Sequence, residues 1–436
     1  MACGRPASAL AAGVRPREVW AWAMYDFANS GYTTVVVTAV FNAYFVAEVA
    51  GNAPWATFLW TVALAVSNLL VMVSAPALGA YADARAAKKP LLAVTTVGCV
   101  LFTAALALTD RGDIALAFML VVLSSFFFGC GENLIAAFLP ELAHEDALGR
   151  LSGWGWSLGY VGGLVSLGVS LAYVSAAQAR GVSATGFVPG TMLITALIFA
   201  LASLPTFLFL RERAVPAMTG AGVVTTAFAR LLETLRHARR YADFRRFLVC
   251  LVFYQAGIQA VVALAAIYAQ QAMAFTTRDT LILILVVNVT AAVGAFFFGQ
   301  VQDRIGHVRT IILTLIGWLL TVVLAWAAQG PALFWVAANM AGLCLGSSQS
   351  AGRALVGYLS PPARIAEFFG LWGLAVKLSS ILGPVTYGAV TWFSGGDHRT
   401  AILVTGSYFV VGIAIVAGVD TARGRRSALA TDTVAD

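Results

Sequence analysis

Two short stretches of the sequence repeat each other and decide the fold: GAYADARAAKK at Gly79–Lys89 and GQVQDRIGHVR at Gly299–Arg309. Each has a glycine, an aspartate four positions later and basic residues at its far end, and the two are 220 residues apart (299 − 79). Two later pairs of stretches align at an offset of 217 residues: Gly129 with Gly346, and Gly153 with Gly370. A nearly constant offset over this length indicates two similar halves, one after the other.

The composition indicates an integral membrane protein. Of the 436 residues, 60% are hydrophobic and 11% are charged, whereas soluble domains carry about 25% charged residues. A spanning helix needs about 20 mostly apolar residues, and twelve such windows follow one another along the chain. They are residues 19–47, 55–82, 90–109, 114–140, 151–175, 190–210, 246–273, 280–302, 308–328, 332–359, 365–393 and 400–419. The sequence therefore predicts an all-α membrane protein with twelve transmembrane helices in two pseudo-symmetric six-helix bundles.

The basic residues predict how these helices are oriented. When the N-terminus is placed inside, 21 of the 27 Lys and Arg residues fall in inner loops, four fall in outer loops and two fall within windows. Because inner loops are enriched in Lys and Arg, we expect both termini in the cytoplasm and the protein in the plasma (inner) membrane. The net charge of +7 is spread over short loops. This distribution argues against nucleic-acid binding, which needs basic residues gathered on one soluble face.

The longest break between windows divides the chain into domains. We expect an N-terminal six-helix bundle (1–210), a cytoplasmic linker (211–245) and a C-terminal six-helix bundle with a short tail (246–436). Within the linker, apolar residues share one helical face and basic residues fill the other; the apolar ones are Phe228, Leu231, Leu232 and Leu235. This pattern predicts an amphipathic helix on the anionic inner membrane surface, with a plain tether as the alternative.

The repeated stretches resemble the inner-loop motif of the major facilitator superfamily, Gly-x-x-x-Asp-Arg-x-Gly. The second copy matches it at Gly299, Asp303, Arg304, Gly306 and Arg309. The first copy keeps Gly79, Asp83, Lys88 and Lys89, but it has Ala84 where the family has a basic residue and Ala86 where the family has glycine. The resemblance implies the major facilitator fold, and with it a secondary transporter.

Each repeated aspartate lies at the inner end of a helix, beside a basic turn. A carboxylate there can pair with an arginine or cap the N-terminus of a neighbouring helix. Such a contact can hold the inner side shut and release it, so we expect both loops to act as gates. The more complete second copy is expected to contribute more. The alternative is that the loops only set the topology.

Further stretches resemble a narrower branch, the vacuole-effluxer-like (unknown major facilitator) family. They are WAMYDFANSGYTTVVVTAVF (22–41), NLIAAFLPELA (133–143), GRLSGWGWSLGYVGG (149–163) and AEFFGLWGLAVKLSSILGP (366–384). The best-known members of that branch are vacuolar amino-acid effluxers. The resemblance therefore implies transport of a small solute, with efflux as the implied direction.

Polar residues inside the windows are the candidates for a binding site, because a charge at the bilayer centre costs about 2.5–3.5 kcal/mol on insertion scales. They are Asp26, Glu132, Asn133, Gln255, Gln259, Gln349, Arg353 and Lys377. The superfamily resemblance implies that helices 1, 4, 7 and 10 line a central cavity, and all of these residues except Lys377 lie on those helices. Asn29 joins them, because helical spacing places it on the face of Asp26. We expect these nine residues to line a cavity for substrate or ion.

The formal charges of this set cancel: Asp26 and Glu132 against Arg353 and Lys377. A neutral site with both signs suits a zwitterion such as an amino acid. Asp26 itself has two interpretations. It binds the solute or a coupling proton or sodium ion, or it only pairs with Arg353 or Lys377 to hold the halves together.

The sequence gives no sign of catalysis or of a resident cofactor or metal. Gly155–Gly159 matches the G-x-S-x-G pattern of serine hydrolases, but its flanks form one apolar helix and not a strand followed by a helix. We interpret Gly155, Gly159 and Gly163 as a small-residue face for helix packing. The five cysteines form no CxxC pair. We therefore predict a monomeric secondary transporter working by alternating access; a membrane enzyme and a non-transporting sensor on a transporter fold are the alternatives.

Overall fold

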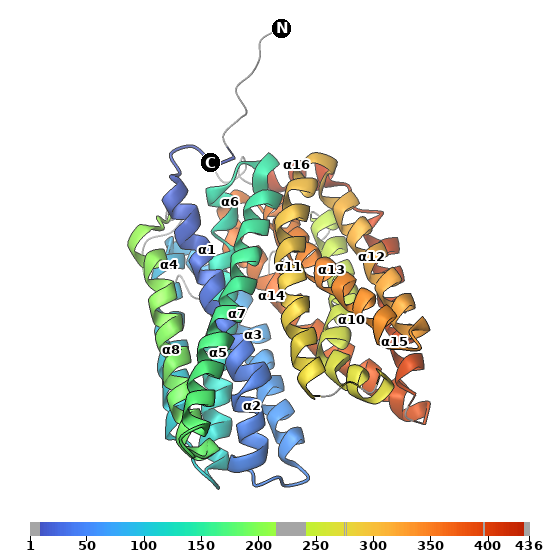
Figure 1. Ribbon diagram of the computed structural model, residues 1–436. Coiled ribbons are helices and arrows are strands. Elements are labelled where there is room, and N and C mark those ends of the chain that lie inside the picture. Colours follow the sequence, from blue (N-terminus) through green and yellow to red (C-terminus); the bar gives the residue numbers. More distant parts are fainter. Residues whose placement is uncertain (1–8, 215–240, 274, 276, 396, 431–436) are drawn as a thin grey trace.

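The computed structural model (Figure 1) describes residues 9–214, 241–273, 275, 277–395 and 397–430. Its N-terminal half contains α1 (Pro16–Tyr32), η1 (Thr33–Ala39), α2 (Phe41–Tyr44), η2 (Phe45–Val49), α3 (Ala56–Arg85), α4 (Lys88–Ala105), η3 (Leu106–Leu108), α5 (Ile114–Ala136), α6 (Leu139–Leu142), η4 (Glu145–Ala147), α7 (Leu148–Gln178) and α8 (Ala184–Phe209). Its C-terminal half contains α10 (Ala242–Met273), α11 (Thr277–Ile305), α12 (His307–Ala327), α13 (Pro331–Leu359), η5 (Pro362–Arg364), α14 (Ile365–Phe393), α15 (His398–Val416) and α16 (Thr421–Leu429).

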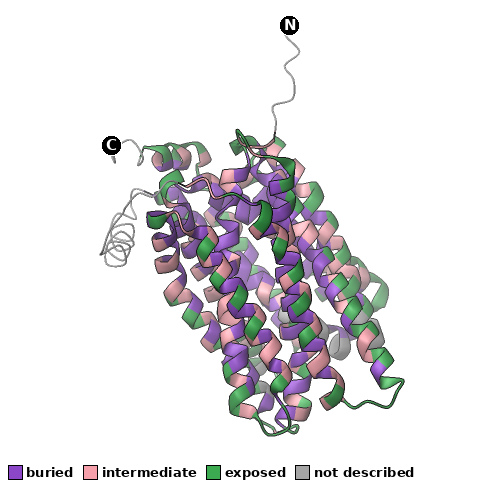
Figure 2. Ribbon diagram, turned by 90° about the vertical axis from the view of Figure 1, so that its left-hand side faces the viewer, coloured by how far each residue is buried: buried purple, intermediate pink, exposed green. Residues whose placement is uncertain are grey.

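Within these ranges, twelve helical spans are long and apolar enough to cross a membrane, which confirms the twelve predicted windows. Large apolar side chains such as Phe58, Val73 and Leu208 lie on the surface of the protein. Exposed residues follow the outer faces of the helices while buried residues face the interior (Figure 2). This distribution is expected where lipid is the solvent, because an apolar side chain loses nothing there by exposure. The four apolar residues predicted to form an amphipathic face in the linker lie outside the described residues.

The first span, Pro16–Val49, departs from a regular α-helix in its second half. Two wide turns, η1 and η2, interrupt it, and they carry bonds from the Val40 amide to the Val35 carbonyl (2.9 Å) and from the Ala50 amide to the Phe45 carbonyl (2.8 Å). The run that contains η1, TTVVVTA, is rich in β-branched residues, whose side chains crowd an α-helix. Wide turns of this kind often accompany functional sites.

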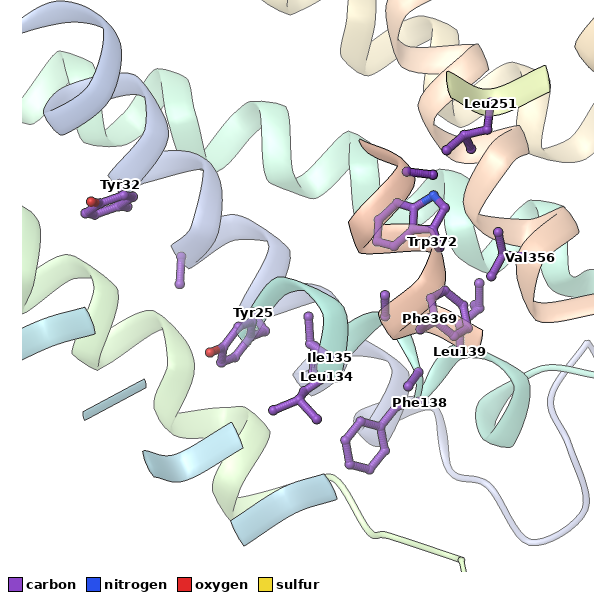
Figure 3. Close-up of a cluster of buried hydrophobic side chains, with 14 of the residues drawn as sticks. Tyr25, Tyr32, Leu134, Ile135, Phe138, Leu139, Leu251, Val356, Phe369 and Trp372 are labelled. Carbon is purple, nitrogen blue, oxygen red and sulfur yellow. The ribbon is translucent and has the colours of Figure 1, made fainter. Parts of the chain in front are cut away.

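The two halves meet through pairs of long helices, α7 with α11 and α3 with α14, and α7 and α11 lie side by side in Figure 1. The α6 and α16 segments lie at the same end of the molecule (Figure 1), which we call the gate end. Near it, one buried cluster combines Phe138 and Leu139 of the N-terminal half with Val356 and Phe369 of the C-terminal half (Figure 3). Apolar packing therefore joins the halves at this end.

Candidate substrate site and gate

The two repeated aspartates bind helix N-termini in the opposite half. Asp83, at the end of α3, accepts hydrogen bonds from the Ala366 amide (3.1 Å) and the Glu367 amide (2.8 Å) at the start of α14. Asp303, at the end of α11, accepts them from the Gly149 amide (2.9 Å) and the Arg150 amide (3.1 Å) at the start of α7. Amides of the first helical turn lack partners within their own helix and carry positive dipole charge. Each carboxylate therefore joins the halves at the gate end.

The repeat seen in the sequence reappears in these contacts. The amides that bind Asp83 and Asp303 are 217 residues apart (366 − 149), the offset of the later repeated stretches. The glycines beside them repeat as well. A side chain at Gly79 would meet the Ala366 backbone, and one at Gly299 would lie 2.6 Å from the Gly149 carbonyl oxygen. Both crossings therefore need glycine so that the backbones can approach.

The other predicted gate residues lie in different surroundings. Lys88 forms an ion pair with Glu141, and the Lys89 ammonium donates to the Leu210 carbonyl (2.6 Å), so both stay within the N-terminal half. Arg304 and Arg309 are exposed. Gly306 has φ +91° in the turn before α12, where a side chain would be strained. A pocket of about 140 Å³ beside the α7–α11 crossing is lined by Arg150, Gln300, Asp303 and Arg304.

Inside the membrane spans, Arg353 of α13 reaches across to the N-terminal half. Its Nη1 donates to Asp26 Oδ2 on α1 (2.7 Å), its Nε donates to Ser152 Oγ on α7 (3.1 Å) and its Nη2 donates to the Ser152 carbonyl (2.9 Å). The guanidinium lies 4.7 Å from the Trp22 ring and 5.4 Å from the Trp156 ring. Only 3% of the Arg353 side chain is exposed. Its charge is thus held by a carboxylate, a serine and two indole faces, all from the opposite half.

The glycines of α7 make room for this ion pair. A Cβ at Gly155 would lie 2.5 Å from Asp26 Oδ2 and 2.6 Å from Arg353 Nη2. Gly159 and Gly163 likewise pack against α1, beside Ser30. The interpretation of these three glycines as a packing face agrees with these contacts, and Gly155 has the further effect of leaving space beside a buried charge.

A second ion pair joins the halves through α5 and α14. Lys377 Nζ lies 3.5 Å from Glu132 Oε2, and its ammonium lies 5.9 Å from the Phe128 ring. The Lys377 side chain is 13% exposed and that of Glu132 is 26% exposed. Asn133, beside Glu132, packs directly on Gly373 of α14. The partner of Asp26 is therefore Arg353, and Lys377 pairs with the other predicted carboxylate.

The predicted asparagine and glutamine side chains lie in different surroundings. Gln255 Nε2 donates to Gln349 Oε1 (2.6 Å), which joins α10 to α13 inside the C-terminal half. Gln259 lies one turn further along α10 and is partly buried. Asn29 Oδ1 and Asn133 Nδ2 are buried with no hydrogen-bond partner among the described residues. Buried polar atoms are rarely left unpaired in folded proteins, and both of these atoms belong to predicted site residues.

Several contact residues were not among the sequence-based candidates. Ser152, Trp22 and Trp156 surround Arg353, and the only sequence signal for them was their place in the quoted family stretches. At the gate end, Arg425 of α16 forms an ion pair with Glu145 of η4 and donates to the Tyr358 carbonyl (3.2 Å). Neither the repeat nor a motif in the sequence relates Glu145 to Arg425. Across the ranges that the structure describes, no three His, Cys, Asp or Glu side chains gather to form a metal site.

Comparison with known proteins identifies the family. The model of the vacuole effluxer Atg22-like family matches residues 56–429. The chain belongs to this family. An uncharacterized MFS-type transporter of Bacillus subtilis, YxiO, is 27% identical over 401 residues, which cover 91% of this chain and 93% of that protein. Autophagy-related protein 22-1 of Penicillium rubens is 24% identical over 310 residues, covering 64% of this chain and 50% of that protein.

Solved structures share the fold of this Atg22-like protein. The human organic anion transporter MFSD10 superposes with a TM-score of 0.74 at 13% identity, covering 92% of this chain and 100% of that one. The proton:xylose symporter XylE superposes with a TM-score of 0.69 at 15% identity, covering 91% and 93%. These similarities confirm the predicted fold of twelve helices in two six-helix bundles. The protein is an integral membrane transporter of the MFS type.

Proposed function

We propose that this protein is a secondary transporter that exports a small zwitterionic solute, such as an amino acid, by alternating access. The observation that carries the proposal is the pair of ion pairs inside the membrane spans, Asp26–Arg353 and Glu132–Lys377, each of which joins one half to the other. Intramembrane charges in transporters usually mark the path of substrate or ion. Because both pairs cross the interface, rocking of the halves has to make and break them.

The chemistry of the set favours a zwitterion. Two carboxylates and two cations stand opposite each other, so a solute that carries one charge of each sign can replace a contact on both sides without leaving a charge unpaired. The unpartnered atoms Asn29 Oδ1 and Asn133 Nδ2 offer one acceptor and one donor. The predicted cavity residues Gln255, Gln259 and Gln349 are assigned to the same site. A doubly charged anion fits less well, since each cation already has a carboxylate.

Coupling and orientation complete the proposal. Asp26 and Glu132 are the groups that can take up a coupling proton or a sodium ion when a solute occupies their cation partners. Asp83 and Asp303 gate the inner side of the protein. The basic residues of their loops, Lys88 and Arg304 among them, orient this end of the protein toward the cytoplasm. The gate end is then cytoplasmic, as are both termini, in a monomer of the plasma (inner) membrane. We also propose the domain division after residue 210; the predicted start of the second bundle at residue 246 lies within α10, which begins at Ala242. The family name, vacuole effluxer, supports export.

The test is uptake into proteoliposomes preloaded with a mixture of amino acids, measured with and without a pH or sodium gradient. Each active amino acid is compared with its N-acetyl derivative, which lacks the cation, and with its amide, which lacks the carboxylate. We expect both derivatives to lose most of the exchange. We also expect Asp26→Asn, which keeps an acceptor oxygen for Arg353, to fold normally and to lose most transport. Full exchange of both derivatives would exclude a zwitterion site.

A further inference from the structure

The first turn of α7 touches both the gate and the buried ion pair. Its Gly149 and Arg150 amides bind Asp303. Only two residues later, Ser152 receives two hydrogen bonds from Arg353. Ser152 is fully buried. Since α7 belongs to the N-terminal half and both partners belong to the C-terminal half, this one turn carries contacts that must all break together when the gate end opens.

Ser152 takes part in three hydrogen bonds in this place. Its hydroxyl donates to the Ser350 carbonyl (2.8 Å) and accepts from Arg353 Nε, while its carbonyl accepts from Arg353 Nη2. The hydroxyl and carbonyl together hold one edge of the guanidinium as a carboxylate would. Nη1 is thereby turned toward Asp26. The planar fork of arginine has a fixed geometry, so the Ser152 contacts set which donors remain for Asp26 or for a solute.

The α13 side of the contact is tied to the gate as well. Gln302 precedes Asp303 on α11, and its Nε2 donates to the Ala351 carbonyl (3.0 Å). The α13 turn that carries Ser350 and Arg353 is therefore attached to the α11 turn that carries Asp303. This bond lies within the C-terminal half and is kept when the halves separate, so the gate aspartate and Arg353 move as one unit relative to α7.

We infer that Ser152 is a positioning residue that couples Arg353 to the gate. It fixes the guanidinium against α7 while the gate end is closed. On the proposed function, a solute carboxylate that draws Nη1 away from Asp26 turns the planar guanidinium and weakens both bonds to Ser152. The bonds to Asp303 and the Ser152–Ser350 hydrogen bond then remain at the start of α7, and the open state gains in population. A ligand shifts such an equilibrium only through contacts that differ between the states, and the Arg353–Ser152 contacts are contacts of that kind.

The experiment measures the gate directly. Spin labels are placed at Asp146 and Ala363, two exposed residues that lie just before α7 and α14 in opposite halves. Cys3 is replaced by serine, and the four other cysteines are buried. The distance between the labels is measured by double electron–electron resonance in the whole chain. One measurement is made without solute and one with a millimolar mixture of amino acids. Ser152→Ala is compared with Ser170→Ala, a control in the same helix whose buried hydroxyl has no hydrogen-bond partner among the described residues.

We expect Ser152→Ala to increase the ratio of open to closed gate about tenfold without solute and to shrink the further increase that solute causes. Ser170→Ala should leave both unchanged, and the thermal unfolding midpoints of the two variants should agree. If Ser152→Ala expresses poorly, Ser152→Cys, similar in size but a much weaker hydrogen-bonding group, replaces it. A label distance in these variants equal to that of Ser170→Ala overturns the inference. A wild-type protein that does not respond to amino acids contradicts the proposed substrate, while the comparison without solute still decides the role of Ser152.

Discussion

Removal of either gate aspartate should shift the protein toward a state open at the gate end. In Asp83→Ala the bonds from the Ala366 and Glu367 amides are lost, and in Asp303→Ala those from the start of α7 are lost. A hydrogen bond to a charged group contributes about 1.5–3 kcal/mol net. Water can replace part of this interaction once the gate opens. We therefore take the loss of each pair of bonds to destabilise the closed state, relative to the open state, by about 2–3 kcal/mol. The ratio of open to closed states should then rise roughly 30- to 150-fold in each variant.

The structure also limits how far the open-to-closed ratio can differ between Asp303→Ala and Asp83→Ala. Asp303 has an additional ion pair with Arg150 at 3.5 Å, and 39% of the Arg150 side chain is exposed. Exposed ion pairs contribute about 0–1 kcal/mol. Asp303→Ala should therefore exceed Asp83→Ala by no more than about fivefold, in the direction expected from the more complete motif of the second copy.

The assay is the label distance between Asp146 and Ala363. Asp397→Ala is the matched control, because Asp397 accepts hydrogen bonds from the Arg399 amide (2.8 Å) and the Thr400 amide (3.2 Å) of its own helix, α15. It removes an N-terminal cap without a contact between halves. An unchanged label distance in both gate variants would refute the reasoning and would mean that the repeated loops set topology only.

Three further predictions concern the site and the other contact between halves. Arg353→Lys should weaken the apparent affinity for solute about tenfold or more, because lysine cannot hold Ser152 and a carboxylate in one fork; equal affinity in counterflow would contradict a solute contact. Gly155→Ala, whose Cβ would overlap the buried ion pair, should abolish transport, whereas Gly168→Ala, with nothing within 4 Å, should not. Arg425→Ala breaks the ion pair with Glu145, whose side chain is 52% exposed. The free-energy difference between the closed and open gate should change by no more than about 1 kcal/mol. A larger shift, measured from the populations of the label distances, would show that α16 stabilises the closed state by more than this ion pair.

The spans were predictable because lipid imposes a simple rule. Every backbone polar group in the membrane must be satisfied within the segment, so an apolar window of sufficient length is a helix, and twelve windows gave twelve spans. The wide turns η1 and η2 were not predicted. Crowding by β-branched residues disfavours a regular helix without specifying where the register shifts, so hydropathy cannot locate such turns.

The charged residues inside the spans could be picked out of the sequence one by one, but their pairing could not. The energetic cost of burying Asp26 and Arg353 marks each of them in the sequence, while the choice between Arg353 and Lys377 as the partner of Asp26 depends on how α13 and α14 approach α1. Ser152 carries no such cost, because a serine is inexpensive in a helix, and so its role is visible only in the structure. Lys88 is the opposite case. Its place in the repeated motif suggested a contact between the halves, but its ion-pair partner Glu141 belongs to the same half.

The depth of the two ion pairs bears on the two interpretations of Asp26. Arg353 lies six residues before the end of α13 at Leu359, or about 9 Å from the gate end at 1.5 Å per residue. Lys377 lies twelve residues after the start of α14 at Ile365, or about 18 Å from it. On the proposed function, a solute bound between the two ion pairs would have to pass Asp26–Arg353 to exchange with the gate side. A pair that closes this path when intact, and that contacts the solute when broken, holds the halves together and binds the solute at successive stages of one cycle. On the proposed function, the structural role of Asp26 and its transport role would then be consequences of the same contact.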